Sequence, residues 1–312
     1  MSLGRVVCVV GPTASGKSAV ADLLARALGT SVVSVDAMQV YRGMDIGTAK
    51  TPPAERLAPL LMVDVADPLE DYSVRLFQRD ARACVDALLA EDRVPILCGG
   101  TGLYLDAVID EMSFPAGEKG GASRRAYEAL LGERGPAALH ALLSERDPES
   151  AAIIHPNNSR RVVRALEMLD EGESYARKHR GLRAHVPHYD AVIWGLTMER
   201  GRLYERIDAR VDAMVASGLV DEVRQLAERG LTTELTAGQA IGYKEVLQAL
   251  AGECTLEEAI ETIKLRSRRY AKRQLSWLRR DGRVRWLDLD ELGVEGAVDT
   301  VLEGLGVRRG SL

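Results

Sequence analysis

Residues 6–18 read VVCVVGPTASGKS and join a run of five apolar residues to a glycine-rich loop. The loop fits the pattern G-x-x-x-x-G-K-[ST], in which backbone amides surround a diphosphate, a lysine adds positive charge and a hydroxyl can bind Mg²⁺. A strand pattern before it and a helical pattern after it supply the context that the motif requires. We therefore predict a phosphate site, with Ser18 as a magnesium ligand, at Gly11, Pro12, Thr13, Ala14, Ser15, Gly16, Lys17 and Ser18.

The pattern around this loop predicts an α/β fold. The β-rich runs VVCVV, SVVSVD and VPILCGG alternate with helical stretches, and strands that are apolar throughout are typical of a parallel sheet covered on both faces. Ligands of such sheets bind at the carboxyl ends of the strands, where GPTASGKS, DAMQVY and GGTGLY follow. From about residue 123 helical periods dominate. We expect a core formed by 1–120 and 188–312, with a helical insertion at 121–187.

The composition is typical of a globular protein. Apolar residues make up 46% of 312 residues, and no apolar run approaches the ~20 residues of a membrane span. The four cysteines show no C-x-x-C spacing, so neither a zinc site nor a disulfide framework is indicated. We expect a cytoplasmic protein that does not contact a membrane.

A polar and aromatic cluster follows the second predicted strand, where Asp36, Gln39 and Tyr41 lie within six residues. From the end of that strand Asp36 should face the phosphate loop. It could hold magnesium through water, act as a general base, or cap a turn. Gln39 and Tyr41 offer an amide and an aromatic face suited to a nucleobase, and Thr101 in GGTGLY should lie beside the loop.

Positive charge gathers towards the C-terminus although the net charge is −5. Between Lys264 and Arg285 the chain has ten basic residues and one acidic residue, Asp281. This basic segment is either a surface that faces a polyanion or a solvated helix face. Within its stretch KRQLSWLR, Trp277 either stacks on a base or belongs to the core. RRVVR, QAIGYK and the pair Arg206 and Arg210 are further candidates for polyanion contact.

Seven segments in fixed order carry a resemblance: GPTASGKS, DAMQVYRGMDIGTAK, DYSVRLFQRDA, GGTGLY, NNSRRVVRALE, QAIGYKE and KRQLSWLR. Together they resemble the tRNA dimethylallyltransferase (isopentenyl-tRNA transferase) family. The resemblance implies a P-loop nucleotide-kinase-like core with a helical insertion domain. It also implies transfer of a dimethylallyl group from dimethylallyl diphosphate to the exocyclic amine of the adenosine on the 3′ side of the anticodon, with release of diphosphate. The expected cofactor is Mg²⁺, and the expected partner of this monomeric enzyme is the tRNA anticodon arm.

The resemblance also assigns roles to residues. The phosphate loop, with Lys17, would hold the diphosphate of the donor, Asp36 would take the proton from the amine, and Arg210 would neutralise the departing diphosphate. The sequence departs from the family at Ala37, where many relatives carry serine, and at Leu60–Leu61, where histidine is frequent. The implied tRNA contacts are Asp36, Ala37, Met38, Gln39, Thr101, Arg124, Arg160, Arg161, Val162, Val163, Arg164, Gln239, Ala240, Ile241, Gly242, Tyr243, Lys244, Lys272, Arg273, Gln274, Trp277 and Arg279.

Two other classes of protein share the phosphate loop. A small-molecule kinase would use ATP to phosphorylate an alcohol or a nucleotide, but it has no need of the basic segment with its tryptophan. A nucleic-acid-binding ATPase switch would need a carboxylate after an apolar strand, and the strand VPILC ends in glycines instead. Both observations favour the transferase.

Overall fold

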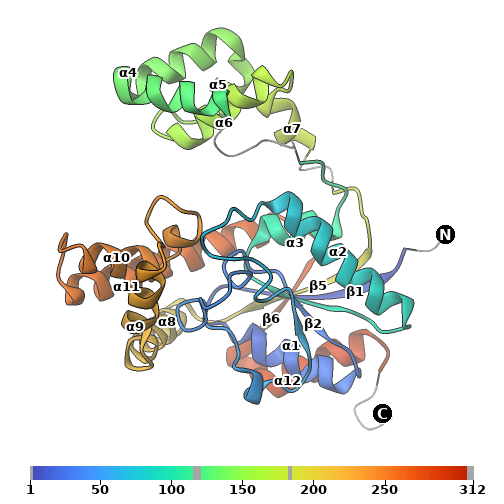
Figure 1. The fold of residues 1–312 in the computed structure, drawn as a ribbon. Coiled ribbons are helices and arrows are strands. Elements are labelled where there is room, and N and C mark those ends of the chain that lie inside the picture. The colour runs from blue at the N-terminus through green and yellow to red at the C-terminus, as the bar shows by residue number, and fades with distance from the viewer. Residues whose placement is uncertain (1–2, 115–120, 182–184, 308–312) are drawn as a thin grey trace. The chain divides into compact units, whose positions relative to one another are not determined.

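The computed structural model describes residues 3–114, 121–181 and 185–307, and its chain divides into two compact units (Figure 1). The larger unit comprises Met1–Ile109 and Pro187–Leu312, and the smaller one Asp110–Val186. The strands of the larger unit are β1 (Arg5–Val10), β2 (Val32–Ser34), β3 (Leu60–Leu61), β4 (Ile96–Gly99), β5 (Asp190–Thr197) and β6 (Val284–Asp288). Its α-helices are α1 (Lys17–Ala27), α2 (Val74–Ala90), α3 (Gly102–Ile109), α8 (Arg200–Ala216), α9 (Leu219–Glu228), α10 (Tyr243–Leu250), α11 (Leu256–Leu278) and α12 (Leu289–Gly304).

The strands within the described residues form one parallel sheet in the order β3-β2-β4-β1-β5-β6. This arrangement confirms the predicted α/β fold. The predicted strands VVCVV, SVVSVD and VPILCGG correspond to β1, β2 and β4. Two short edge strands, β3 and β6, were not predicted, and β6 begins inside the basic segment, which is therefore not a single helix.

Each face of the sheet carries its own core. Along β1, Val6, Cys8 and Val10 belong to one core, whereas Val7 and Val9 belong to the other, because successive side chains of a strand point to opposite faces. In Figure 1, α1 and α12 lie side by side on the face of Val7, and α2 and α3 cover the opposite face. The sheet is thus buried on both sides, as its continuous apolar strands predict.

The carboxyl ends of β1, β2 and β4 carry the three motifs expected there. The phosphate loop follows β1, Asp36 lies two residues beyond β2, and Thr101 lies two residues beyond β4. Helices α8–α11 contribute to the same core as α2 and α3, through residues such as Val211, Val223 and Ile263. These late helices are therefore part of the larger unit's core rather than an appended tail.

The smaller unit is helical and consists of α4 (Ala122–Arg146), α5 (Pro148–Ile153), α6 (Ser159–Asp170) and α7 (Tyr175–Gly181). Leu139, Leu143, Val162 and Leu166 are fully buried in its core. Gly135, with φ 76°, interrupts α4 before Pro136, a position where a helix cannot continue undisturbed. The predicted loop at 114–121 falls mostly outside the described residues.

Candidate active site

The phosphate loop has the backbone conformation of an anion-binding turn. Gly16 has φ 91° and Ala14 has φ 64°, a region that a residue other than glycine seldom adopts. Helix α1 begins directly after the loop, at Lys17, so its N-terminus faces the site. The Ser15 hydroxyl is buried and has no hydrogen-bond partner among the described residues. An unpaired buried hydroxyl costs free energy, so it fits a loop shaped for a bound group.

Two cations converge on this loop. Burial lowers the pKa of Lys17, and the nearby charge of Arg210 lowers it further, although Cys98 and Asp36 act in the opposite direction. Burial likewise lowers the pKa of Arg210, with Asp36 opposing and Arg206 adding to the effect. Crowded and desolvated cations gain stability when an anion enters. The loop is therefore electrostatically suited to a diphosphate.

Helices α8 and α11 fix the loop from outside the sheet. Arg206 Nε donates to the Ala14 carbonyl at 2.9 Å, and Arg210 Nη1 donates to Thr13 Oγ1 at 3.4 Å. The buried Gln274 accepts from the Thr13 amide at 2.9 Å and donates to the Gly100 carbonyl at 3.0 Å. Gln274 thus links the loops after β1 and β4. Both ends of its amide are engaged by the protein, and the expected contact of Gln274 with tRNA stays a prediction.

Asp36 stabilises its own turn with one oxygen. Its Oδ1 accepts from the backbone amides of Met38 and Gln39 at 2.9 and 3.4 Å. The Ala37 amide donates to Thr101 Oγ1 at 3.3 Å, which ties the turn after β2 to the loop after β4. Asp36 also lines a cavity with the phosphate loop. The turn-cap role is therefore compatible with a chemical role for the other carboxylate oxygen.

Gln39 is held inside the protein. Its Oε1 accepts from Ser34 Oγ at 2.8 Å, and its Nε2 donates to the carbonyls of Thr48 and Ala49 at 3.1 and 3.4 Å. The amide therefore joins the start of the 36–50 segment to its end. Gln39 lines the cavity as predicted, but its amide group is engaged by the protein rather than directed to a ligand.

A cavity of about 340 Å³ joins the predicted elements. One wall carries Thr13, Lys17, Ser18 and Asp36, and the facing helices contribute Arg210. Another part of the lining is apolar and comes from α8, α11 and the loop before α10, through Ile207, Val211, Met214, Ile241 and Ile263. An anion site, a carboxylate and an apolar surface thus border one space. Such a cavity suits a ligand with a charged head and a small apolar tail.

Tyr270 belongs to this site and was not predicted. It lines the cavity, and burial and the charge of Asp36 raise its pKa, whereas the neighbouring side chains of Thr101 and Gln274 lower it. A signal was present in the sequence, because Ile263, Ser267, Tyr270 and Gln274 follow one helical face at spacings of four, three and four. All four line the cavity.

Comparison with known proteins agrees with this geometry. A model of the family described as IPP transferase matches residues 39–281, and one described as isopentenyl transferase matches residues 4–58. The chain belongs to the IPP transferase family. A tRNA dimethylallyltransferase of Streptomyces coelicolor is 50% identical over 91% of this chain and 90% of its own. One of Desulforudis audaxviator is 45% identical over 96% of both chains.

Solved structures show the same fold. The full-length tRNA isopentenylpyrophosphate transferase of Bacillus halodurans superimposes with a TM-score of 0.72 at 43% identity, over 97% of this chain and 96% of its own. A eukaryotic dimethylallyltransferase, described as acting on tRNA, gives a TM-score of 0.81 at 28% identity, over 98% of this chain and 80% of its own. The P-loop core with a helical insertion is therefore the architecture of the IPP transferase family.

The tRNA contacts implied by membership of this family fall into two groups in the structure. Several of these side chains are buried in the structure, so they do not lie on the outer surface, and their contact with tRNA stays a prediction. The buried side chains are Val162, Val163, Ala240 and Tyr243, each less than 9% exposed. In the smaller unit Arg160 and Arg161 are exposed, whereas Arg124 and Arg164 both contact the buried Glu167 at 3.5 Å.

The basic segment divides in the same way. Arg266 contacts Glu245 at 2.6 Å, Lys264 contacts Asp212 at 2.8 Å, and Arg268 contacts Asp208, so these three cations stabilise the packing of α11. Five further cations, on α11 and directly after it, are exposed: Arg269, Lys272, Arg273, Arg279 and Arg280; Arg285 in β6 is exposed as well. Within the described residues none of the five has an acidic partner within ion-pair distance. We call these five residues the basic surface.

Trp277 is anchored to the core although it is 38% exposed. Its Nε1 donates to the buried Asp106 carboxylate at 3.1 Å, and its ring lies against Gly102, where a Cβ would come within 2.1 Å of it. Replacing Trp277 by alanine should lower the free energy of unfolding more than the free energy of tRNA binding. The reason is that the buried Asp106 carboxylate loses a hydrogen-bond partner, at a cost of about 1–3 kcal/mol. Thermal unfolding and filter binding on the same variant check this. A larger loss of affinity than of stability would assign the indole to RNA stacking.

No helix in the described ranges is long and apolar enough to cross a membrane.

Proposed function

We propose that this protein transfers a dimethylallyl group from dimethylallyl diphosphate to the exocyclic amine of the adenosine on the 3′ side of the anticodon in tRNA. The observation that carries the proposal is that Lys17, Arg210, Asp36 and an apolar wall border the same cavity. Relatives named tRNA dimethylallyltransferase, covering more than nine-tenths of the chain, support it. The protein is thus a transferase that modifies tRNA.

The reaction exchanges one bond for another. The amine nitrogen forms a bond to the first carbon of the dimethylallyl group while the bond from that carbon to the diphosphate oxygen breaks. The diphosphate leaves with the electron pair, and the Asp36 carboxylate accepts the proton that the amine releases. The weak nucleophile depends on positioning, which the turn held by Thr101 and the Asp36 side chain provides.

The protein's cations serve the leaving group. Lys17 and Arg210 would offset the negative charge that the diphosphate gains as the bond breaks, since preorganised charges are most effective where charge develops. The apolar residues of α8 and α11 would surround the five-carbon tail. Arg210 therefore acts on the donor rather than on the RNA.

Mg²⁺ fits the oxygen-rich end of the cavity. Ser18 and Asp36 both line it, and no group of three metal-binding side chains occurs among the described residues. Mg²⁺ commonly takes one or two protein oxygens and fills its remaining positions with substrate phosphates and water. We propose that Ser18, with Asp36 nearby, holds the ion beside the diphosphate, where it would add positive charge against the leaving group.

The RNA would reach the cavity from the basic surface. A stacked adenine must leave its helix or loop before an amine can enter an enclosed site. Arg273 belongs to both the basic surface and the cavity lining, so the surface continues into the site. The exposed arginines would hold phosphates of the anticodon arm while the base enters.

One assay separates this proposal from a small-molecule kinase. The protein is mixed with bulk tRNA, dimethylallyl diphosphate labelled in carbon and ATP labelled at the γ-phosphate. We expect the carbon label in the RNA and the phosphate label in no product. Phosphate label in a small molecule, with none of the carbon label in RNA, would favour the kinase.

The basic surface gives a second prediction. Replacing Arg273 and Arg279 together by alanine should reduce the slope of log affinity for tRNA against log salt concentration by about one to two units. Binding of all tRNAs should weaken similarly, because each phosphate contact that is lost reduces the number of counterions released on binding. Titrations at several salt concentrations measure the slope. The matched control removes the exposed Arg26 and Arg75 from α1 and α2, which should leave the slope unchanged. Equal slopes for both variants would make the basic surface a solvated helix face.

A further inference from the structure

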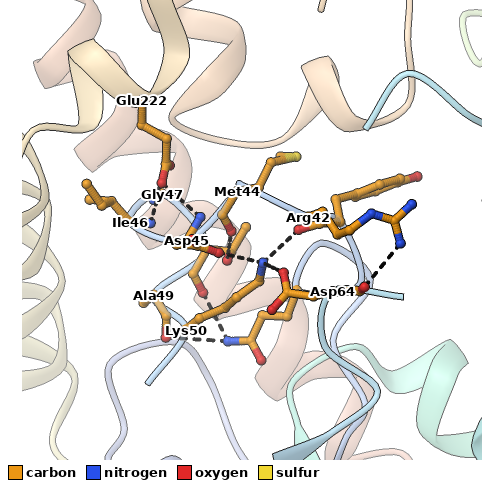
Figure 2. Close-up of polar contacts among 12 residues, drawn as sticks. Arg42, Met44, Asp45, Ile46, Gly47, Ala49, Lys50, Asp64 and Glu222 are labelled. Carbon is orange, nitrogen blue, oxygen red and sulfur yellow. Dashed lines mark hydrogen bonds and ion pairs between the residues drawn. The ribbon is translucent and has the colours of Figure 1, made fainter. Parts of the chain in front are cut away.

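A single carboxylate outside the cavity holds the segment that carries Asp36 and Gln39. Glu222, in the first turn of α9, accepts the backbone amides of Asp45 and Ile46 at Oε2, both at 2.8 Å. Its Oε1 accepts the Gly47 amide at 3.1 Å (Figure 2). Acidic residues in the first turn of a helix usually interact with their own helix. The Glu222 carboxylate instead accepts hydrogen bonds from residues 45–47, which lie far from α9 in sequence.

The same carboxylate reaches a second wall of the cavity. Tyr243 Oη donates to Glu222 Oε1 at 2.6 Å, and burial, followed by the charge of Glu222, raises the pKa of Tyr243 well above its ordinary value. Tyr243 directly follows Gln239–Gly242, which line the same cavity as Gly47 and Thr48. A Cβ on Gly47 would lie 2.5 Å from the Tyr243 ring, so the two walls are packed without spare room. Glu222 therefore bridges both walls.

Lys50 closes the segment from the inside. Its side chain is only 3% exposed, and Nζ donates to the Tyr41 carbonyl at 2.6 Å, to Asp45 Oδ1 at 2.7 Å and to Asp64 Oδ1 at 2.6 Å (Figure 2). These three bonds use every proton of the ammonium group. Lys50 is thus a crosslink between the two halves of the segment and the loop after β3, and it has no proton left for a phosphate.

The contacts form a continuous path to Asp36. Glu222 fixes residues 45–47, and the following carbonyls of Thr48 and Ala49 accept from Gln39 Nε2. The backbone N–H of Gln39 in turn donates to Asp36 Oδ1 at 3.4 Å. A shift of residues 45–49 would release Gln39 and then the turn of Asp36. The phosphate loop is held separately, by Arg206 and Gln274.

We propose that Glu222 is a positioning residue for the transfer reaction, and that it acts with Lys50 through the backbone of residues 45–49 to place Asp36 and Gln39. The inference rests on the proposed function. It predicts that loss of the carboxylate lowers the turnover number while the affinity for the prenyl donor is retained, because the donor's diphosphate binds to a loop that Glu222 does not touch.

The test compares Glu222→Gln with Asp221→Asn. The Gln variant keeps the size of the side chain, but its NH₂ group replaces one of the two carboxylate oxygens that accept hydrogen bonds. Asp221 is the neighbouring residue, is 69% exposed and contacts only Arg224 among the described residues, so its variant controls for the loss of one charge on α9. Hydrogen exchange of the 44–50 segment is measured for each variant, with kcat and KM for donor and tRNA, well below the melting temperature.

We expect Glu222→Gln to speed exchange at residues 45–47 by about tenfold or more. We expect it to lower kcat by about 10- to 100-fold, since small displacements of reacting groups are costly, with the donor KM within about twofold of the wild type. The Asp221→Asn variant should match the wild type throughout. A lower melting temperature with wild-type kcat and exchange would reduce Glu222 to an ordinary stabilising contact and overturn the proposal.

A milder variant covers the case in which Glu222→Gln does not fold. Tyr243→Phe removes one hydrogen bond to Glu222 and leaves the three amide contacts, so kcat should fall by about two- to tenfold with the donor KM retained. A wild-type kcat for a Glu222→Gln or Tyr243→Phe protein that is folded would contradict the inference. If the wild type itself transfers no label to tRNA, the proposed function fails. In that case hydrogen exchange of the 44–50 segment alone tests the role of Glu222, and an unchanged exchange rate in Glu222→Gln would overturn it.

Discussion

Replacing Asp36 by alanine is expected to lower the rate of dimethylallyl transfer by about 10²–10⁴-fold, the usual cost of losing a general base. Affinity for tRNA should change little, because it depends on many phosphate contacts at a distance from the carboxylate. Single-turnover transfer with saturating tRNA measures the chemical step, and filter binding measures the affinity. Near wild-type transfer would remove Asp36 from the mechanism.

The second role of Asp36, as the cap of its own turn, needs a control. Asparagine can still accept the Met38 and Gln39 amides with its side-chain oxygen, as Asp36 Oδ1 does, but it cannot take a proton at neutral pH. Asp36→Asn should therefore lose nearly as much activity as Asp36→Ala and keep more of the stability. If the asparagine variant recovers most of the activity, Asp36 acts by capping the turn and not as a base.

Replacing Lys17 by alanine is expected to weaken the binding of dimethylallyl diphosphate by about 10- to 100-fold, the typical effect of losing one hydrogen bond to a charged group. The lysine is desolvated beside Arg210, so the diphosphate gains more from it than from a cation in water. Calorimetric titration of the free enzyme with the donor measures the change. Unchanged donor affinity would mean that the loop does not hold the donor.

The exposed Arg26 provides the matched control for this experiment. It lies on the same helix, α1, and Arg26→Ala removes the same charge. Donor affinity should be retained in this variant, because screening by salt makes a distant surface charge ineffective. A similar loss in both variants would indicate a general effect of net charge rather than a contact of Lys17.

The parts of the fold that could be predicted are those with a local signal. The apolar strand at Val6–Val10, the loop at 11–18 and the helix starting at Lys17 follow from periodicity and loop composition alone. Ser73 marks the start of α2, where its hydroxyl accepts the Leu76 amide at 3.3 Å. Strand β6 carries no such signal, because it begins at the end of the arginine-rich segment, which has the composition of a helix surface.

The site was harder to predict because its partners are distant in sequence. Gln274 is 261 residues from the Thr13 amide that it binds, and Glu222 is 176 residues from Ile46. No periodicity relates such pairs, since tertiary folding alone brings them together. The same limit explains why the hydrogen bonds of the Gln39 side chain could not be predicted. Its position after β2 predicts a place in the cavity, but only the structure shows that Ser34 and the carbonyls of Thr48 and Ala49 occupy its amide.

Burial divides the expected tRNA contacts into exposed and packed side chains. In RRVVR, Arg160 and Arg161 lie on the exposed face of α6, whereas Val162 and Val163 pack into the core of the smaller unit. In QAIGYK the aromatic residue is buried under the 45–47 segment for the same reason. A motif fixes the order of its residues along the chain, and the packing of its helix decides which of them a ligand can reach.

The most direct test of the account is the identity of the modified nucleoside. Unmodified tRNA is incubated with the protein, Mg²⁺ and deuterated dimethylallyl diphosphate, and is then digested to nucleosides and, separately, to defined oligonucleotides for mass spectrometry. The account predicts one deuterated dimethylallyl group on the exocyclic nitrogen of adenosine, in the oligonucleotide that contains the anticodon and on its 3′ side. RNA without the deuterated group, or with the group on another base, would contradict it.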